Sequence, residues 1–103
     1  MSEKRQAVQY YQTLGVRLHD FQLLGTDDVF TQGLPWGLRA NFVHLPTGNH
    51  YQSVWVYTPH RSKGLMSGYI NTTKTPFITQ PSCGILDWFV KRGVPVLTVA
   101  DVK

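Results

Sequence analysis

The sequence predicts an α+β fold: an antiparallel sheet of hairpin and meander strands, with an N-terminal helix and a helix near the C-terminus packed on one face. Two observations predict it. Runs of alternating apolar and polar residues surround a short turn between residues 38 and 58, and segments with helical periodicity lie on either side, at 3–14 and 81–92. The length of 103 residues suits a single domain, residues 1–103, with one hydrophobic core.

The N-terminal segment 3–14 has the spacing of an amphipathic helix with one apolar stripe. The stripe consists of Ala7, Val8, Tyr11 and Leu14. Ser2 can cap the start of this helix, and Gly15 can end it in a left-handed conformation. Residues 16–24 then have the pattern of a strand or an extended segment, and the sequence GTDD that closes it is typical of a turn.

The clearest strand signal comes from residues 38–45 and 50–58, which alternate in polarity on either side of the turn PTGN. Two such runs around a short glycine-containing turn predict a β-hairpin. Alternation places these residues on one face of the second strand: Tyr51, Ser53, Trp55 and Tyr57. Residues 64–72 are expected to add a third strand to the meander, whereas FTQGLPWG, before the hairpin, has the composition of a loop.

Residues 81–92 have a second helical stripe, with two basic residues in the last turn and Gly93 after it. The stripe consists of Ile85, Leu86, Phe89 and Val90, and we expect Ile85, Leu86 and Phe89 to share one core with Phe42 or the residue that faces it. Residues 94–102 predict a final strand, which Pro95 confines to a sheet edge because proline donates no ladder hydrogen bond. That edge can pair with a second copy of the chain, which predicts a homodimer.

Charge is distributed unevenly along the chain. The net charge is +4, and no acidic residue occurs between Val29 and Leu86. This stretch carries the basic and imidazole side chains of Arg39, His44, His50, His60, Arg61, Lys63 and Lys74. Such a field either attracts polyanions or an acidic protein surface, or only keeps a small domain soluble.

The cysteine count and the apolar runs predict the compartment. Cys83 is the single cysteine, which excludes a disulfide within the chain and fits a reducing environment. The polar N-terminal residues and the short apolar runs indicate neither a signal peptide nor a membrane span. We therefore expect a cytoplasmic protein that binds no membrane.

The segment from residue 54 to residue 90 resembles the core of small phage and mobile-element accessory proteins. The resemblance depends on Val56, Lys63, Gly64, Met66, Tyr69, Pro81, Ile85, Leu86 and Asp87. Those proteins usually continue with acidic sequence that contains Gly and Tyr, whereas this chain ends in the apolar segment VPVLTVADV. The resemblance implies that a mobile element encodes the chain, and it implies no particular activity.

The segment HRSKG also resembles the acetyl-CoA loop of the N-acetyltransferase superfamily, in which backbone amides of an Arg/Gln-x-x-Gly-x-Gly/Ala pattern hold a pyrophosphate at a helix N-terminus. Arg61 and Gly64 match the first half of this pattern. Met66 stands where the pattern has a small residue, and the residues after it are expected to form a poor helix. Without that helix the anion site would lack its dipole, and the chain is short for that fold.

Candidates for catalysis and metal binding are few. His44 and His50 flank the PTGN turn, but no Cys/His spacing in the chain is that of a zinc site. Asp27 and Asp28 lie in a turn signal, where side chain to backbone hydrogen bonds explain them. Cys83 has no histidine beside it in the sequence. We therefore expect no catalytic residue, no metal and no cofactor.

The basic residues and the aromatic strand face together predict nucleic-acid binding, because phosphates need spaced cations and unpaired bases stack on aromatic rings. The predicted contact residues are Arg39, Tyr51, Trp55, Tyr57, His60, Arg61, Lys63 and Lys74. The aromatic face can instead pack beneath the helices as core. Residues 57–69 are expected to form a hairpin tip that holds Arg61 and Lys63 in water, with no acidic neighbour in sequence.

The primary expectation is therefore a small non-enzymatic binding protein that acts on DNA or RNA. Two alternatives stay open. One is a protein-interaction module or inhibitor that docks on an acidic surface, with Trp36 and Trp55 as its anchors. The other is a minimal transferase or hydrolase that uses the loop at residues 60–64.

Overall fold

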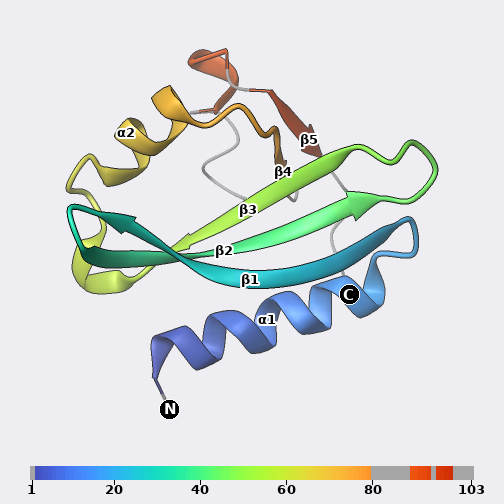
Figure 1. The fold of residues 1–103 in the computed structure, drawn as a ribbon, viewed down its shortest axis with the longest axis horizontal. Helices are drawn as coiled ribbons and strands as arrows, with labels where there is room; N and C mark the ends of the chain where they lie inside the picture. The colour runs from blue at the N-terminus through green and yellow to red at the C-terminus, as the bar shows by residue number, and fades with distance from the viewer. Residues whose placement is uncertain (1, 80–88, 94, 99–103) are drawn as a thin grey trace.

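A computed structural model of the chain describes residues 2–79, 89–93 and 95–98. The elements are helix α1 (Glu3–Arg17), strands β1 (Phe21–Thr31), β2 (Leu34–His44) and β3 (His50–Val56), the 3-10 helix η1 (Thr58–His60), helix α2 (Leu65–Thr72), and strands β4 (Phe77–Thr79) and β5 (Val96–Thr98). Residues 89–91 are also helical. Figure 1 shows a layer of strands with α1 on one side and α2 on the other. The predicted α+β class is confirmed.

The sheet is mixed, so the prediction of a purely antiparallel meander was wrong. Its strand order is β1-β2-β3-β4-β5. β1, β2 and β3 are antiparallel neighbours, whereas β4 is parallel to both β3 and β5. Parallel neighbours need a crossover connection, and α2 supplies it between β3 and β4. β5 lies at the edge of the described sheet, as expected for the strand after Pro95, and its pairing with a second copy stays a prediction.

Helix α1 begins where the sequence predicts and ends later. The Ser2 hydroxyl accepts a hydrogen bond from the backbone N–H of Arg5, which caps the first turn. The helix then continues through Gly15 to Arg17 instead of ending at the glycine. A Cβ on Gly15 would lie 3.1 Å from the Cβ of Leu23, so this glycine lets the helix approach β1 closely. The buried positions are those of the predicted stripe: Ala7, Tyr11 and Leu14.

The predicted hairpin of β2 and β3 is confirmed, but a second hairpin precedes it. β1 and β2 are joined by a tight turn at Gln32 and Gly33, both of which have positive φ. The segment FTQGLPWG is therefore the end of two strands and the turn between them, and its assignment to a loop was wrong. Of the predicted strand 16–24, only the part from Phe21 onward is extended in the structure.

The hydrophobic core lies between α1 and the face of the sheet that α1 covers. Alternation along β2 directs Leu38, Ala40 and Phe42 to this face, where all three are buried. Partly buried rings and side chains pack against this cluster, among them Tyr51, Trp55 and Tyr57. The predicted place of Phe42 in the core is confirmed. Phe89 is buried too and lies 4.8 Å from the ring of Phe77, measured between centroids, while Ile85 and Leu86 fall outside the described residues.

Helix α2 replaces the third meander strand that was predicted for residues 64–72. Its partly buried apolar residues are Leu65, Met66, Tyr69 and Ile70, which have the spacing of one helix face. α2 lies on the sheet face opposite α1, so the two helices described in full do not share one face (Figure 1). The predicted helix 81–92 falls mostly outside the described residues.

A polar network joins α2 to its side of the sheet. The Tyr69 hydroxyl donates a hydrogen bond to the side-chain carbonyl of Gln52, and Arg39 donates one to Tyr69 over 3.3 Å. Gln52 is 1% exposed, and its amide nitrogen donates to Thr73 Oγ1 at 2.9 Å and to the Thr75 carbonyl at 2.8 Å. Because every one of these buried polar groups has a partner, the network fixes the position of α2. No helix in the described part of the chain is both long and apolar enough to span a bilayer.

Candidate functional site

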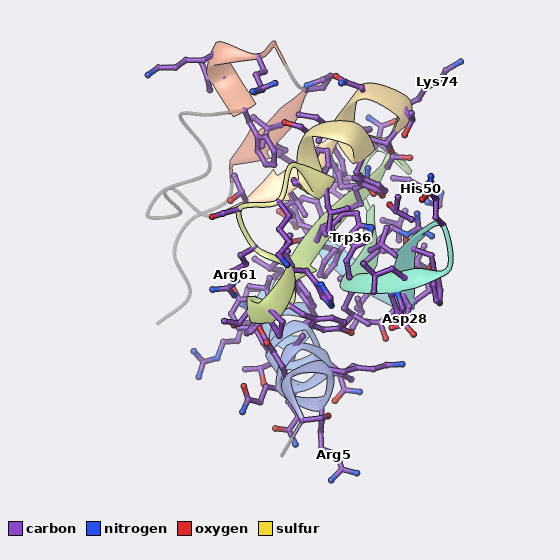
Figure 2. The ribbon with its side chains drawn as sticks, turned by 90° about the vertical axis from the view of Figure 1, so that its left-hand side faces the viewer. Arg5, Asp28, Trp36, His50, Arg61 and Lys74 are labelled. Carbon is purple, nitrogen blue, oxygen red and sulfur yellow. The ribbon has the colours of Figure 1, made fainter. Side chains whose placement is uncertain are left out.

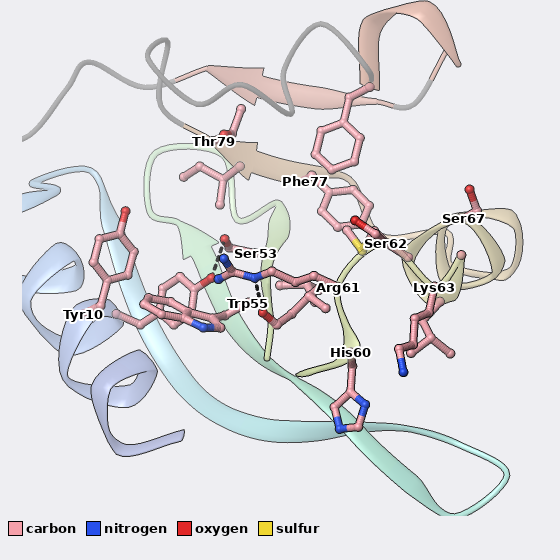
Figure 3. A pocket seen from close by; sticks show the side chains of 18 of the residues that line it. Tyr10, Ser53, Trp55, His60, Arg61, Ser62, Lys63, Ser67, Phe77 and Thr79 are labelled. Atoms are coloured by element: carbon pink, nitrogen blue, oxygen red, sulfur yellow. Dashed lines mark hydrogen bonds between the residues drawn. The ribbon is translucent and has the colours of Figure 1, made fainter. Parts of the chain in front are cut away.

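The parallel strands β3 and β4 meet at one point and then separate. Among the described residues, the only pair between them is Gln52 with Phe77, although β3 remains paired with β2 as far as Val56. A cavity of about 800 Å³ lies at this separation. It is lined by α1, by β3 from Ser53 to Val56, by residues 60–64, by the first turn of α2, by β4 and by Phe89 (Figure 3). The volume is within the range of small-molecule and cofactor sites.

Because β3 and β4 separate, the edge of β3 that faces β4 borders the cavity. The Gln52 N–H donates to the Pro76 carbonyl on the β4 side over 3.0 Å. Because strand geometry repeats every two residues, the N–H and C=O of Val54 and Val56 point to the same side. The Val56 carbonyl accepts a hydrogen bond of 2.9 Å from Nε of Arg61. The Val54 amide and carbonyl are thus aimed at the cavity, beyond the last pair with β4.

The connection from β3 to α2 was predicted to be a hairpin tip, and this prediction was wrong. Residues 57–64 instead form η1 and a turn that leads into α2, which is the crossover between parallel strands. Gly64 has φ 76°, as the expected conformational freedom requires, and Ser62 has φ 63°. A non-glycine residue in this region costs on the order of 1 kcal/mol or more, and such strain concentrates at ligand-binding loops.

The first turn of α2 borders the cavity and leaves backbone donors available. Gly64 is the N-cap residue, no side chain caps the helix, and no acidic residue lies in the first turn. The first N–H groups of a helix lack intrahelical acceptors and carry the positive end of the helix dipole. Leu65, Met66 and Ser67 all line the cavity. The expectation that no helix follows HRSKG was therefore wrong, since α2 starts directly after Gly64.

Glu3, from the start of α1, fastens the connection to β3. Its carboxylate accepts hydrogen bonds from Nε1 of Trp55 at 2.8 Å and from the backbone N–H of Thr58 at 2.9 Å. These hydrogen bonds, followed by the charge of Arg61, hold the pKa of Glu3 below its usual 4.5. The Arg61 guanidinium lies 3.7 Å from the same carboxylate. Arg61 was expected to have no acidic neighbour, and the fold brings one from the far end of the chain.

The cavity end beside α1 is mostly apolar and aromatic. Tyr11, Leu14 and Ile78 belong to one buried cluster and also line the cavity. The Tyr11 hydroxyl and Ser53 Oγ are 2.9 Å apart and satisfy one another. Tyr10 lies on the Trp55 ring in an edge-on contact, with 5.7 Å between the ring centroids. In Figure 3, Tyr10 is well separated from Lys63 at the other end of the cavity.

The structure brings half of the predicted contact residues together. Trp55, His60, Arg61 and Lys63 all line the cavity. Lys74 is exposed beyond α2 and lies apart from Arg61 in Figure 2. Tyr51 and Tyr57 pack against the core, so the aromatic strand face is covered by α1. Partial burial, followed by proximity to the Asp28 carboxylate, raises the pKa of Tyr57.

Arg39 lies on the opposite sheet face and has an acidic partner. Its Nε donates to Asp27 Oδ1 over 3.0 Å, its Nη2 pairs with the other carboxylate oxygen, and Asn41 donates to the same carboxylate. The hydrogen bonds from Arg39 lower the pKa of Asp27, and the carboxylate raises the pKa of Arg39 in turn. Arg39 is thus committed to a bridge between β1 and β2, which argues against a role in phosphate binding.

Trp36 is buried and was wrongly expected to be a surface anchor. It is 1% exposed, donates from Nε1 to Thr31 Oγ1 over 2.9 Å and contacts the ring of Tyr69. The β1–β2 register skips Trp36, which makes it the extra residue of a bulge. His44 bonds to Thr47 in the hairpin turn. Within residues 2–79, 89–93 and 95–98, no cluster of His, Cys, Asp and Glu could hold a metal ion.

Sequence reasoning missed the part of the site that α1 contributes. Glu3 and Tyr10 approach Trp55, which lies some 45 to 52 residues away along the chain. No local pattern marks such contacts. Comparison of the chain with protein-family models, with curated proteins and with solved structures finds no match.

Proposed function

We propose that the cavity binds coenzyme A or one of its acyl thioesters and that the chain is a small acyltransferase. The observation that carries this proposal is the separation of the parallel strands β3 and β4, with the cavity in the gap and the β3–α2 connection at its rim. In sheets with parallel strands, ligands bind at the carboxyl ends of the strands, where the connecting loops begin.

The rim next to α2 supports recognition of a pyrophosphate. The uncapped first turn of α2 offers backbone N–H groups and a positive dipole end. His60, Arg61 and Lys63 lie around the same opening. Arg61 and Gly64 resemble an acetyl-CoA loop, and the helix that such a loop needs, which the sequence did not predict, follows directly as α2. Met66 still departs from that pattern, and it lies in the cavity wall.

The backbone of β3 supports recognition of the amide-containing arm of coenzyme A. An extended chain that carries amides can hydrogen-bond to an unpaired strand segment, as a peptide does when it adds to a sheet edge. Val54 lies beyond the last described pair of β3 with β4, and its N–H and C=O point into the gap between these strands. With the phosphates at the α2 end and the arm along β3, the thioester would lie near Ser53 and Tyr11.

The chemistry proposed is transfer of the acyl group to an acceptor nitrogen or oxygen. The acceptor atom forms a bond to the thioester carbonyl carbon, the carbon–sulfur bond breaks, and the leaving thiolate takes up the proton that the acceptor loses. Transfer from a bound thioester is favoured when the site holds the two reactants close together and excludes water.

Isothermal titration calorimetry with coenzyme A tests the proposal. We expect binding by the unaltered chain and a loss of roughly tenfold or more in affinity for Lys63→Ala, the size expected when a charge-assisted hydrogen bond disappears. Lys74→Ala is the matched control, because it removes the same charge from an exposed position outside the cavity. Absence of binding by the unaltered chain, or an equal loss in both variants, would refute the site.

Nucleic-acid binding stays a prediction, as do a protein-docking role and origin in a mobile element. The remaining support for nucleic acid is the net charge of +4 and the cluster of cations at the cavity rim, since the aromatic face packs against the core. Fluorescence anisotropy with single- and double-stranded DNA and RNA at two salt concentrations separates this role from coenzyme A binding.

A further inference from the structure

The two ends of the cavity differ in chemistry. At the α2 end, Lys63 is cationic, and the Arg61 guanidinium, which also belongs to the cavity wall, lies 3.7 Å from the Glu3 carboxylate of α1. At the α1 end, the walls come from Tyr10, Leu14, Ile78 and Thr79, and the polar pair of Tyr11 and Ser53 bonds internally. No carboxylate is among the described residues that line either end. The cavity therefore suits a ligand with an anionic end and an apolar end.

We propose that the α1 end accepts an acyl chain longer than acetyl, so that the preferred thioester carries a medium-length apolar acyl group. This inference rests on the proposed function, because the phosphates must occupy the α2 end for the acyl group to reach the α1 end. The apolar side chains of Leu14 and Ile78 line this end. No carboxylate is among the described residues of the cavity wall, so a cationic acyl group would find no opposite charge in that wall.

The walls at this end can shield such a chain from water. Leu14 is 7% exposed and Ile78 4%, so both are fixed in the core rather than free to close the space. Tyr10 is 43% exposed and stands at the rim, held edge-on against Trp55 and Tyr11. It provides an aromatic edge over the opening.

Calorimetry with a series of ligands tests the inference: coenzyme A, acetyl-CoA, hexanoyl-CoA, octanoyl-CoA and free octanoate. Full burial tightens binding by about fourfold per methylene, and half burial by about twofold. Octanoyl-CoA should therefore bind roughly 60-fold more tightly than acetyl-CoA if the chain is half removed from water. Octanoate alone should bind far more weakly, because it does not reach the cations at the α2 end.

Two variants test whether the α1 end of the cavity determines the ratio of octanoyl-CoA affinity to acetyl-CoA affinity. Tyr10→Ala removes the aromatic edge at an exposed position and should reduce the octanoyl-to-acetyl ratio by about two- to tenfold. Thr79→Phe fills the same end from the opposite wall and should abolish the ratio while coenzyme A still binds. Gln9→Ala, exposed on α1 and outside the cavity, is the matched control and should leave the ratio unchanged. Circular dichroism checks that each variant is folded.

The outcomes separate the two proposals. Binding of coenzyme A with equal affinity for acetyl-CoA and octanoyl-CoA would overturn the chain-length inference and leave the proposed function standing. Octanoate that binds as tightly as octanoyl-CoA would overturn it as well, since the cavity would then take fatty acids without the carrier. Failure of every coenzyme A ligand to bind would overturn both.

Discussion

Among the described glycines, Gly37 in β2 has the least room for a Cβ, and Gly37→Ala is the substitution that tests the packing of the hairpin. An ideal Cβ on Gly37 would lie 2.8 Å from the carbonyl oxygen of Trp55 and 3.6 Å from Cγ2 of Val29. Ordinary contacts of a Cβ begin near 3.4 Å, so the new methyl group is short of room by about 0.6 Å. Its obstacle is backbone in a paired strand, which cannot rotate away.

The magnitude follows from overpacking of a rigid neighbour. Inserting a methyl group where the backbone must move costs typically about 1–3 kcal/mol. Gly37→Ala should therefore lower the free energy of unfolding by about this amount. Gly25→Ala is the matched control on β1, because an added Cβ meets nothing within 4 Å there. We expect that variant to be neutral or stabilised by up to about 1 kcal/mol.

Urea denaturation followed by tryptophan fluorescence measures both variants, since Trp36 is buried beside Gly37 and loses its environment on unfolding. The added methyl group also displaces the backbone carbonyl of Trp55 in β3. The Trp55 side chain lines the cavity. Gly37→Ala should thus also weaken coenzyme A binding, whereas Gly25→Ala should not. A Gly37→Ala protein as stable as the unaltered chain would refute the packing of β2 against β3 described above.

Three further predictions concern the polar contacts. Tyr69→Phe should destabilise the fold by about 1–3 kcal/mol in thermal unfolding, because the buried carbonyl of Gln52 loses its donor; an unchanged melting temperature would contradict the network beneath α2. The pKa of Asp27 is lowered by Arg39, so its contribution to stability is present above its usual pKa of 3.8 and disappears as the pH falls through the folded value. Asp27→Asn should accordingly lower the melting temperature at pH 7 and have a progressively smaller effect as the pH falls below 3.8, and an effect that does not change with pH would exclude this linkage. If nucleic acid binds at the cavity rim, Lys63→Ala should reduce the slope of log K against log salt by about 0.7–0.9, and an unaltered slope would place the nucleic-acid contact elsewhere.

Of the candidate site, the sequence indicated the loop and four of the side chains around it. Residue type and position in the sequence singled out four side chains that line the cavity: Trp55, His60, Arg61 and Lys63. The cavity itself was beyond the reach of the sequence. It exists because, in the part of the chain that the structure describes, β4 leaves β3 after a single pair and because α1 supplies a wall, and neither event has a local signature. Partners such as Glu3 and Trp55 meet only once the chain has closed a loop of some 50 residues.

By itself the sequence determined the elements whose signals are local. Alternation from residue 38 to residue 56 specifies the β2–β3 hairpin, because a shift by one residue would move every apolar side chain to the wrong face. The Ser2 cap and the apolar stripe likewise specify the start of α1. Tertiary structure alone decided that residues 65–72 form a helix. Gly68 lowers the helix propensity of this segment, and the hydrogen bond between Tyr69 and Gln52 stabilises the helix on the sheet. Tertiary structure also decided that the aromatic face is core, since burial depends on which helix covers the face, and α1 meets β2 and β3 through contacts distant in sequence, such as Tyr11 with Phe42 and Ser53.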